Sequence, residues 1–168
     1  MAATGVYTTA YREKLAQLSA DELVEQEKSN MPVLWFAVGE GGYDLQPNGS
    51  KLPKAPSAAM TALEAPTNMA AQGGDNPLGG YFQKRLTPVQ ITRAGRDVTV
   101  RCILNANEPG LDNNSKLSGN VGGDPQMFEI GIYDGDITGP STLMAYCTFD
   151  EVTKVPGVQI TLNITIRY

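Results

Sequence analysis

The stretch Val158–Arg167, with the sequence VQITLNITIR, decides the fold class. Its apolar positions alternate with polar ones, and they are Val158, Ile160, Leu162, Ile164 and Ile166. Successive side chains of a β-strand point to opposite faces, so this alternation predicts a strand with one buried face. Burying five such side chains stabilises a fold by roughly 7–15 kcal/mol before chain entropy is subtracted. The strand therefore belongs to a core.

Similar patterns precede this strand. Residues 86–93 and 97–105 read as a hairpin around Ala94-Gly95-Arg96. Residues 128–134 (FEIGIYD), with Phe128, Ile130 and Ile132 on one face, and residues 143–149 read as two further strands. Several strands of this kind predict a mainly β fold, namely an antiparallel β-sandwich whose outer faces are partly solvated.

A length of 168 residues predicts a single domain, residues 1–168. We divide it into an N-terminal helical segment (1–30), an extended interaction loop (39–80) and an antiparallel β core (81–168). In the first segment Thr8 or Thr9 is expected to cap a short helix, and the S-x-x-E capping box at residues 19–22 predicts a second. One or two short N-terminal helices should therefore pack over the sheet.

The segment between helices and core has two parts. Residues 33–38 are apolar at every position, which predicts a short strand that is covered on both faces or lies at a subunit contact. Residues 39–80 are rich in Gly, Pro, Asn, Ser and Ala, with a short helix expected over 57–63 (SAAMTAL). Long irregular stretches inside a compact domain are usually functional, and we expect this long central loop to contact another chain and to be ordered only by it.

The glycine cluster of this loop, Gly39-Glu40-Gly41-Gly42-Tyr43-Asp44, begins like a phosphate-binding loop. A nucleotide fingerprint needs a third glycine where Asp44 stands, and a helix must follow it. The sequel, LQPNG (45–49), is not helical, and a carboxylate would repel phosphate. The cluster is interpreted as a turn.

Candidate catalytic groups are few. The chain has no histidine, which excludes Ser-His-Asp and Cys-His systems. Cys102 and Cys147 lie at apolar strand positions and are expected to be core thiols, and the sequence does not establish whether they are adjacent. Glu129 and Asp150 are a possible carboxylate pair, although strand carboxylates usually point to solvent.

Residues 134–139 (DGDITG) resemble the opening of a calcium loop but lack its twelfth-position glutamate, and they are interpreted as a hairpin turn. We therefore expect no enzymatic activity, no cofactor and no metal.

Charge and hydropathy exclude further classes. The net charge is −5 and no cluster of Lys or Arg stands out, so nucleic acid is not an expected partner. No stretch approaches the roughly 20 apolar residues that span a bilayer, and the N-terminus does not resemble a secretory signal. The protein is expected to fold in a reducing cytoplasm.

The order of these segments resembles the N-terminal, virion-attaching domain of phage tail fibres, the tail-collar fibre family. The matching motifs are YREKLAQL (11–18), AVGEG (37–41), EIGIYD (129–134) and MAY (144–146). The resemblance implies a structural virion protein that is made in the bacterial cytoplasm and then assembled into the tail. It also implies attachment to the baseplate or tail tip, with tail proteins and fibres as partners and a homo-oligomer, a trimer or a sixfold set.

Two departures from the family refine that expectation. Members usually continue into a fibre shaft, whereas this chain stops at Tyr168, and its 39–80 segment is long. Both favour an adaptor at the baseplate over the fibre that touches the host.

Five aromatic residues at the two ends of the long loop are the candidate interface anchors, because aromatic side chains dominate interface energies. They are Trp35, Phe36, Tyr43, Tyr81 and Phe82, and plain domain core is an equally good interpretation of them. The alternative function is a carbohydrate-binding β-sandwich that recognises a host surface glycan. It needs exposed aromatics near amides and carboxylates, and the polar loop 105–124 offers only the latter.

Overall fold

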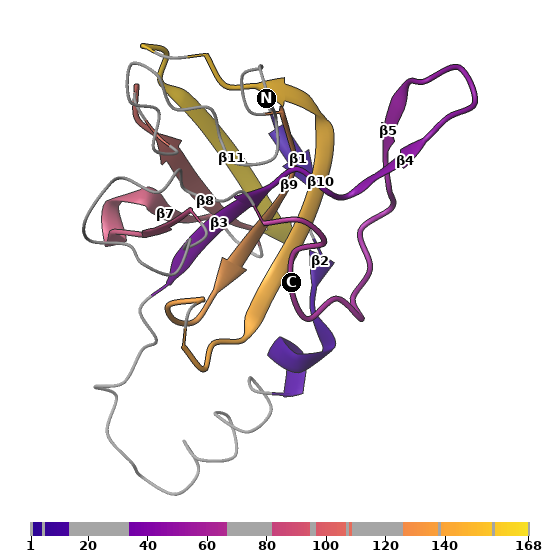
Figure 1. Cartoon of the computed structure of the whole chain (residues 1–168). Helices are drawn as coiled ribbons and strands as arrows, with labels where there is room; N and C mark the ends of the chain where they lie inside the picture. Colours follow the sequence, from indigo (N-terminus) through magenta and orange to yellow (C-terminus); the bar gives the residue numbers. More distant parts are fainter. Residues whose placement is uncertain are drawn as a thin grey trace, which may run out of the picture.

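The fold consists mainly of two antiparallel sheets (Figure 1). This computed structural model describes residues 2–4, 6–13, 34–66, 82–94, 97–106, 108, 126–137, 139–155 and 157–167. The prediction of a mainly β fold with antiparallel sheets is confirmed. One pair departs from that pattern, because the first strand lies parallel to the last.

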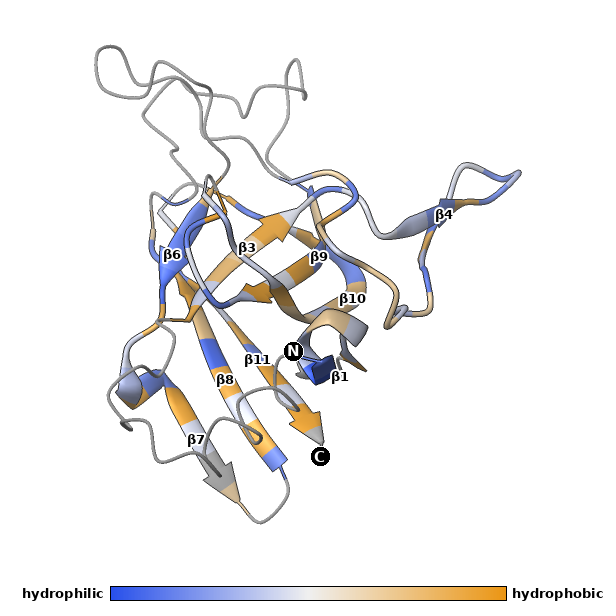
Figure 2. Ribbon diagram, turned by 90° about the horizontal axis from the view of Figure 1, so that it is seen from below, coloured by the Kyte–Doolittle hydropathy of each residue, from blue (hydrophilic) through white to orange (hydrophobic). Residues whose placement is uncertain are grey.

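The first sheet has the order β1-β11-β8-β7. Its strands are β1 (Ala2–Thr4), β7 (Ile91–Ala94), β8 (Asp97–Leu104) and β11 (Ile160–Arg167). β11 pairs with β8 in one uninterrupted register from Ile160↔Leu104 to Arg167↔Asp97. Apolar and polar residues alternate along both strands (Figure 2).

The second sheet has the order β2-β10-β9-β3-β6. Its strands are β2 (Val6–Tyr7), β3 (Trp35–Gly39), β6 (Gln83–Arg85), β9 (Gln126–Tyr133) and β10 (Leu143–Thr153). β9 and β10 are consecutive antiparallel strands, and in the connection between them Asp134 Oδ1 accepts a hydrogen bond from Thr142 N at 2.6 Å. The hairpin turn expected at residues 134–139 is therefore confirmed.

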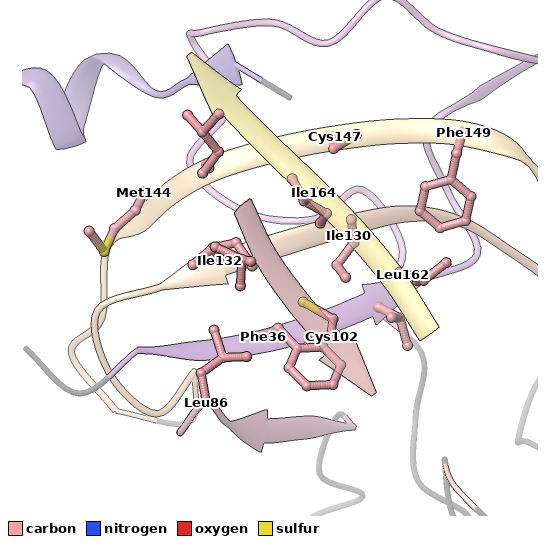
Figure 3. Packing of buried hydrophobic residues seen from close by; sticks show 14 of the residues in the cluster. Phe36, Leu86, Cys102, Ile130, Ile132, Met144, Cys147, Phe149, Leu162 and Ile164 are labelled. Atoms are coloured by element: carbon pink, nitrogen blue, oxygen red, sulfur yellow. The ribbon is translucent and has the colours of Figure 1, made fainter. Parts of the chain in front are cut away.

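Both sheets contribute to one hydrophobic core (Figure 3). Cys102, Leu162 and Ile164 enter it from the first sheet, and Phe36, Ile130 and Ile132 enter it from the second. Since each sheet brings one apolar face, neither face remains in water. The core explains why the alternation along β8 and β11 is so regular.

β3 is buried on both of its faces, as its unbroken apolar sequence predicts. Phe36 and Val38 belong to the main core, whereas Ala37 belongs to a second cluster with Leu63 and Tyr133 on the other side of the sheet. Leu63 comes from the long segment after β3, so that segment covers the outer face of the second sheet.

Several expected elements differ from those observed. One helical turn, residues 9–13, follows Thr8, whose Oγ1 accepts a hydrogen bond from Tyr11 N at 3.2 Å and so caps it. The second expected helix, 19–28, lies outside the described residues. Residues 57–63 are not helical, since only a turn forms at 58–59.

Strand boundaries also differ from the sequence pattern. The first arm of the 86–105 hairpin is short because Pro88–Gln90 form a 3₁₀ turn, η1, and β7 starts at Ile91. Val158, expected on the buried face of the last strand, precedes β11 and is exposed. Over the described ranges, no helix has the length and apolarity needed to cross a membrane.

Candidate functional site: a buried carboxylate and a projecting arm

Glu129 is a carboxylate in the middle of the second sheet, and its side chain is completely buried. It lies on β9, where it pairs with Gly39 of β3 on one side and Thr148 of β10 on the other. The expectation that this side chain points to solvent is wrong, because residues 57–66 cover that face. Asp150 is exposed, so the proposed carboxylate pair does not form a site.

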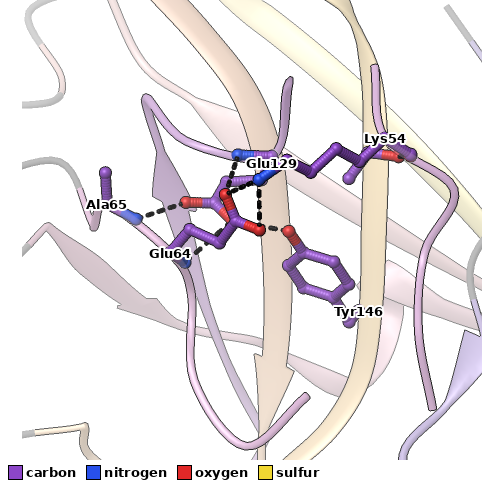
Figure 4. Close-up of polar contacts among 7 residues, drawn as sticks. Lys54, Glu64, Ala65, Glu129 and Tyr146 are labelled. Atoms are coloured by element: carbon purple, nitrogen blue, oxygen red, sulfur yellow. Dashed lines mark hydrogen bonds and ion pairs between the residues drawn. The ribbon is translucent and has the colours of Figure 1, made fainter. Parts of the chain in front are cut away.

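Three donors saturate the Glu129 carboxylate (Figure 4). Oε1 accepts a hydrogen bond from Ala65 N at 2.8 Å. Oε2 accepts one from Glu64 N at 3.0 Å and one from the Tyr146 hydroxyl at 2.8 Å. Burial, and then the bond to Glu129, raise the pKa of Tyr146, so its hydroxyl stays a donor. The carboxylate thus holds the backbone of Glu64 and Ala65 against the second sheet.

The glycine cluster leaves the space that the Glu129 carboxylate occupies. A Cβ at Gly39 would overlap the Glu129 side chain, and one at Gly41 would lie 2.8 Å from Glu129 Oε1 and 2.7 Å from Glu64 Cβ. Gly42 has a φ of +77°, in the left-handed region that L-residues avoid. The turn at GEGG therefore has a physical cause. Its backbone lies so close to a buried side chain that an added Cβ would overlap it.

A second, more exposed carboxylate completes the network. Glu64 Oε2 accepts a hydrogen bond from Gly42 N at 3.2 Å, and Lys54 Nζ lies 2.8 Å and 2.9 Å from the two Glu64 oxygens. The bond from Lys54 lowers the pKa of Glu64, and its bond to Glu64 raises the pKa of Lys54. These contacts close the base of the segment between Gly42 and Lys54.

That segment forms a two-stranded hairpin, β4 (Tyr43–Leu45) and β5 (Lys51–Pro53), which we call the arm. It projects from the body of the molecule (Figure 1). Asn48 Oδ1 accepts hydrogen bonds from Ser50 N at 3.0 Å and Ser50 Oγ at 2.7 Å, and Gly49 takes a φ of +81°. The arm has its own turn chemistry and is not an irregular loop.

Aromatic contacts hold the arm at its base. The ring of Tyr43 packs on Phe128 with centroids 4.7 Å apart, and Lys51 Nζ lies 4.8 Å from both centroids. The same ammonium donates to Gln126 Oε1 at 2.9 Å. Phe128 therefore contacts the arm, rather than sharing the core face of Ile130 and Ile132 as the alternation suggests. The expectation that a partner alone orders residues 39–80 is wrong for residues 39–66.

The five predicted interface residues separate into three groups. Phe36 and Phe82 are core residues, 0% and 4% exposed, whose rings contact edge to face at 6.1 Å, so the prediction of an interface role for them is wrong. Trp35 and Tyr43 are half-buried, Trp35 against the second cluster and Tyr43 on Phe128. Tyr81 lies outside the described residues.

Sequence reasoning missed Leu45, Leu52 and the buried role of Glu129, which it had considered only as a possible partner of Asp150. A carboxylate inside an otherwise apolar strand was a usable signal for that role. Leu45 and Leu52 are 68% and 52% exposed, and their place beside Pro47-Asn48-Gly49 could have identified a hairpin with apolar side chains.

Proton transfer and metal binding find little support in this arrangement. Glu129 has no exposed surface, so it cannot touch a substrate in this conformation. Within the described ranges, no group of three or more Cys, Asp or Glu side chains is placed to hold a metal ion. The network therefore acts as an anchor for the arm.

The two thiols are also structural. Cys102 of β8 and Cys147 of β10 form no disulfide and are buried in the same core, one from each sheet. Burial raises the pKa of both thiols, that of Cys147 to about 11, which makes them poor nucleophiles at neutral pH. The expected core role is confirmed.

Comparison of the chain with protein-family models, with curated proteins and with solved structures gave no match in any of the three.

Proposed function

We propose that the chain is a structural protein of a bacteriophage tail that attaches tail fibres to the baseplate or tail tip through protein–protein contacts. The observation that carries a docking role is the arm, a hairpin held rigidly at its base and bearing exposed leucines beyond it. Two-stranded hairpins have little stability in water, and exposed apolar groups that gather on a projection mark contact sites. The assignment to a tail rests on the sequence motifs that resemble the tail-collar fibre family.

In this proposal the protein works by binding, with other tail or baseplate proteins and fibres as partners and itself as a homo-oligomer. It is made in the bacterial cytoplasm and ends in the virion. The contact residues shift from the core aromatics to the arm, because Phe36 and Phe82 have no exposed surface to offer. Recognition of a glycan is less well supported, since no aromatic side chain of the described residues is exposed.

The test is mass spectrometry of density-purified particles from the producing culture, with copy number measured against a capsid protein. We expect a fixed, small copy number that does not fall on repeated banding, while an abundant host cytoplasmic protein, the matched control, is lost. A copy number that falls in parallel with the host protein would overturn the proposal. A reproducible hit on a glycan array would then favour the carbohydrate-binding function.

A further inference from the structure

Two exposed surfaces with apolar centres lie on opposite sides of the molecule. The arm surface consists of Asp44, Leu45 and Leu52, and the edge surface consists of Arg85 at the end of β6, Val89 of η1 and Arg101 of β8. Val89, on η1, is 85% exposed. β4 and β7 lie at opposite sides of the molecule (Figures 1 and 2), so one copy cannot bring the two surfaces together.

The arm surface is incomplete without a covering partner. The register Asp44↔Leu52 and Leu45↔Lys51 places the two leucines on opposite faces of the hairpin, since side chains alternate along a strand. Among the described strands, β4 and β5 pair only with each other, so both outer edges of the arm are open. A partner that receives the arm can cover both faces at once.

The arm side of the molecule carries more negative than positive charge. Asp44 is exposed on the arm, and Asp150 and Glu151 are exposed on β10, which contacts β5. Of the nearby ammonium groups, Lys54 is paired with Glu64, and Lys51, which lies over two aromatic rings, acts on Glu40, so the two offset only part of this charge. A partner for this side should therefore be basic as well as apolar.

The edge surface is both basic and apolar. Arg85 ends β6 and lies four positions before Val89, and Arg101 is fixed to η1 through a hydrogen bond from Gln90 Nε2 to the Arg101 carbonyl at 2.9 Å. Both arginines are exposed, and across the described ranges neither forms an ion pair, since Glu108 is occupied by Lys84. Among the strands that the structure describes, β7 is the terminal one of its sheet, so it also leaves an open edge.

We propose that the arm surface of one copy docks on the edge surface of a second copy. This inference rests on the proposed role of the arm as a docking element and names its partner. The contact is head-to-tail, because two different surfaces meet, so an open assembly keeps one free arm at one end and one free edge at the other. Repetition of such a contact builds a ring where the rotation closes and a filament where it does not.

Three variants test the contact. The arm variant combines Leu45→Ser with Leu52→Ser, and the edge variant combines Arg85→Glu with Arg101→Glu. The control is Val158→Ser, an exposed valine outside both surfaces. Thermal melts verify that every variant folds, and size-exclusion chromatography with light scattering gives the mass. We expect oligomers for the wild type and the control, and monomers for the arm and edge variants.

Because charge pairs contribute, raising the salt from 0.05 to 0.5 M should weaken the wild-type association about tenfold.

The decisive measurement is an equimolar mixture of the arm variant and the edge variant. One intact arm and one intact edge remain in that mixture, so a 1:1 heterodimer that cannot grow further is expected. A mixture that stays monomeric while the wild type associates would overturn the inference, and an edge variant that still associates by itself would indicate an arm-to-arm contact instead. A wild type that is monomeric at every salt concentration would overturn it too. The proposed tail function would survive either result if the protein still had a fixed copy number in particles.

Discussion

At the scale of single residues, the glycine cluster and Glu129 depend on each other sterically. A side chain at Gly41 would meet Glu64 Cβ at 2.7 Å, and Ala65 N and Glu129 Oε1 each at 2.8 Å, three atoms of the anchor itself. Ala65 N and Glu129 Oε1 are hydrogen-bonded to each other, so neither can move away without disturbing that bond. Glycine is therefore needed in the turn between β3 and the arm because a side chain has no space there, and not only because glycine has a freer backbone.

We expect Gly41→Ala to lower the free energy of unfolding by about 1–3 kcal/mol, the usual range for overpacking. Chemical denaturation monitored by circular dichroism measures the change. Gly135→Ala is the matched control, because its added Cβ would have its nearest neighbour at 3.5 Å, an ordinary contact. Equal effects of the two substitutions would show that the cluster has no packing role.

A pH dependence is expected from Glu40. Burial raises the pKa of this half-buried carboxyl, and Lys51 opposes part of the rise. A carboxyl whose folded pKa exceeds its unfolded pKa contributes stability that is complete below the unfolded pKa and lost as pH rises through the folded pKa. Glu40→Gln should therefore raise Tm by about 1 °C at pH 7, a small gain because water screens the exposed part.

The same substitution should leave Tm unchanged near pH 3, where the wild-type carboxyl is already neutral. Differential scanning calorimetry at both pH values measures this. Asp150→Asn removes one exposed carboxylate and controls for the change in net charge. A gain of equal size at both pH values would contradict the assignment to burial.

At the scale of elements, the strands followed from the sequence and the arm did not. β8, β9, β10 and β11 have alternating or continuous apolar sequences, so the hydropathy of most of their side chains, Glu129 excepted, indicates their burial. The arm is fixed by a carboxylate 64 positions away from Ala65 in the sequence, and no local pattern carries that contact. The helix expected over 57–63 failed for the same reason, because Leu63 and the Glu64 and Ala65 amides are held by the sheet beneath.

Replacing the anchor should loosen the arm while the core stays closed. Glu129→Gln exchanges charge-assisted hydrogen bonds, each of about 1.5–3 kcal/mol, for weaker neutral ones and turns an amide group toward backbone donors. Hydrogen exchange measured by mass spectrometry should then show amides of residues 42–66 exchanging at least about tenfold faster. Peptides from β8 and β11 should keep the wild-type rate.

Tyr146→Phe removes only one of the three donors and should produce a smaller acceleration confined to the same residues. Should the β8 and β11 peptides accelerate as much as the arm, Glu129 supports the whole fold and not the arm. An unchanged rate throughout would mean that the carboxylate contributes nothing to holding the segment.

At the scale of the whole molecule, two sheets share a single core, and this unit carries the arm. The sequence predicted this two-layer unit because most of its strands have one apolar face. Five such faces can leave water only by packing against another layer. It could not predict which strands face each other. The positions of Cys102 on the first sheet and Cys147 on the second supply a probe for each layer.

The two thiols should become reactive together, because one shared core makes the sheets a single cooperative unit. Burial shields both and raises the pKa of both. Labelling with a thiol reagent at mild pH, followed by peptide mapping, should give equal rates at Cys102 and Cys147, each at least about 10³-fold below the rate in denaturant. Added urea should accelerate both in parallel, since each reports global unfolding. Faster labelling of Cys102 would mean that the first sheet opens by itself, and the edge surface it carries would then be too mobile to receive an arm.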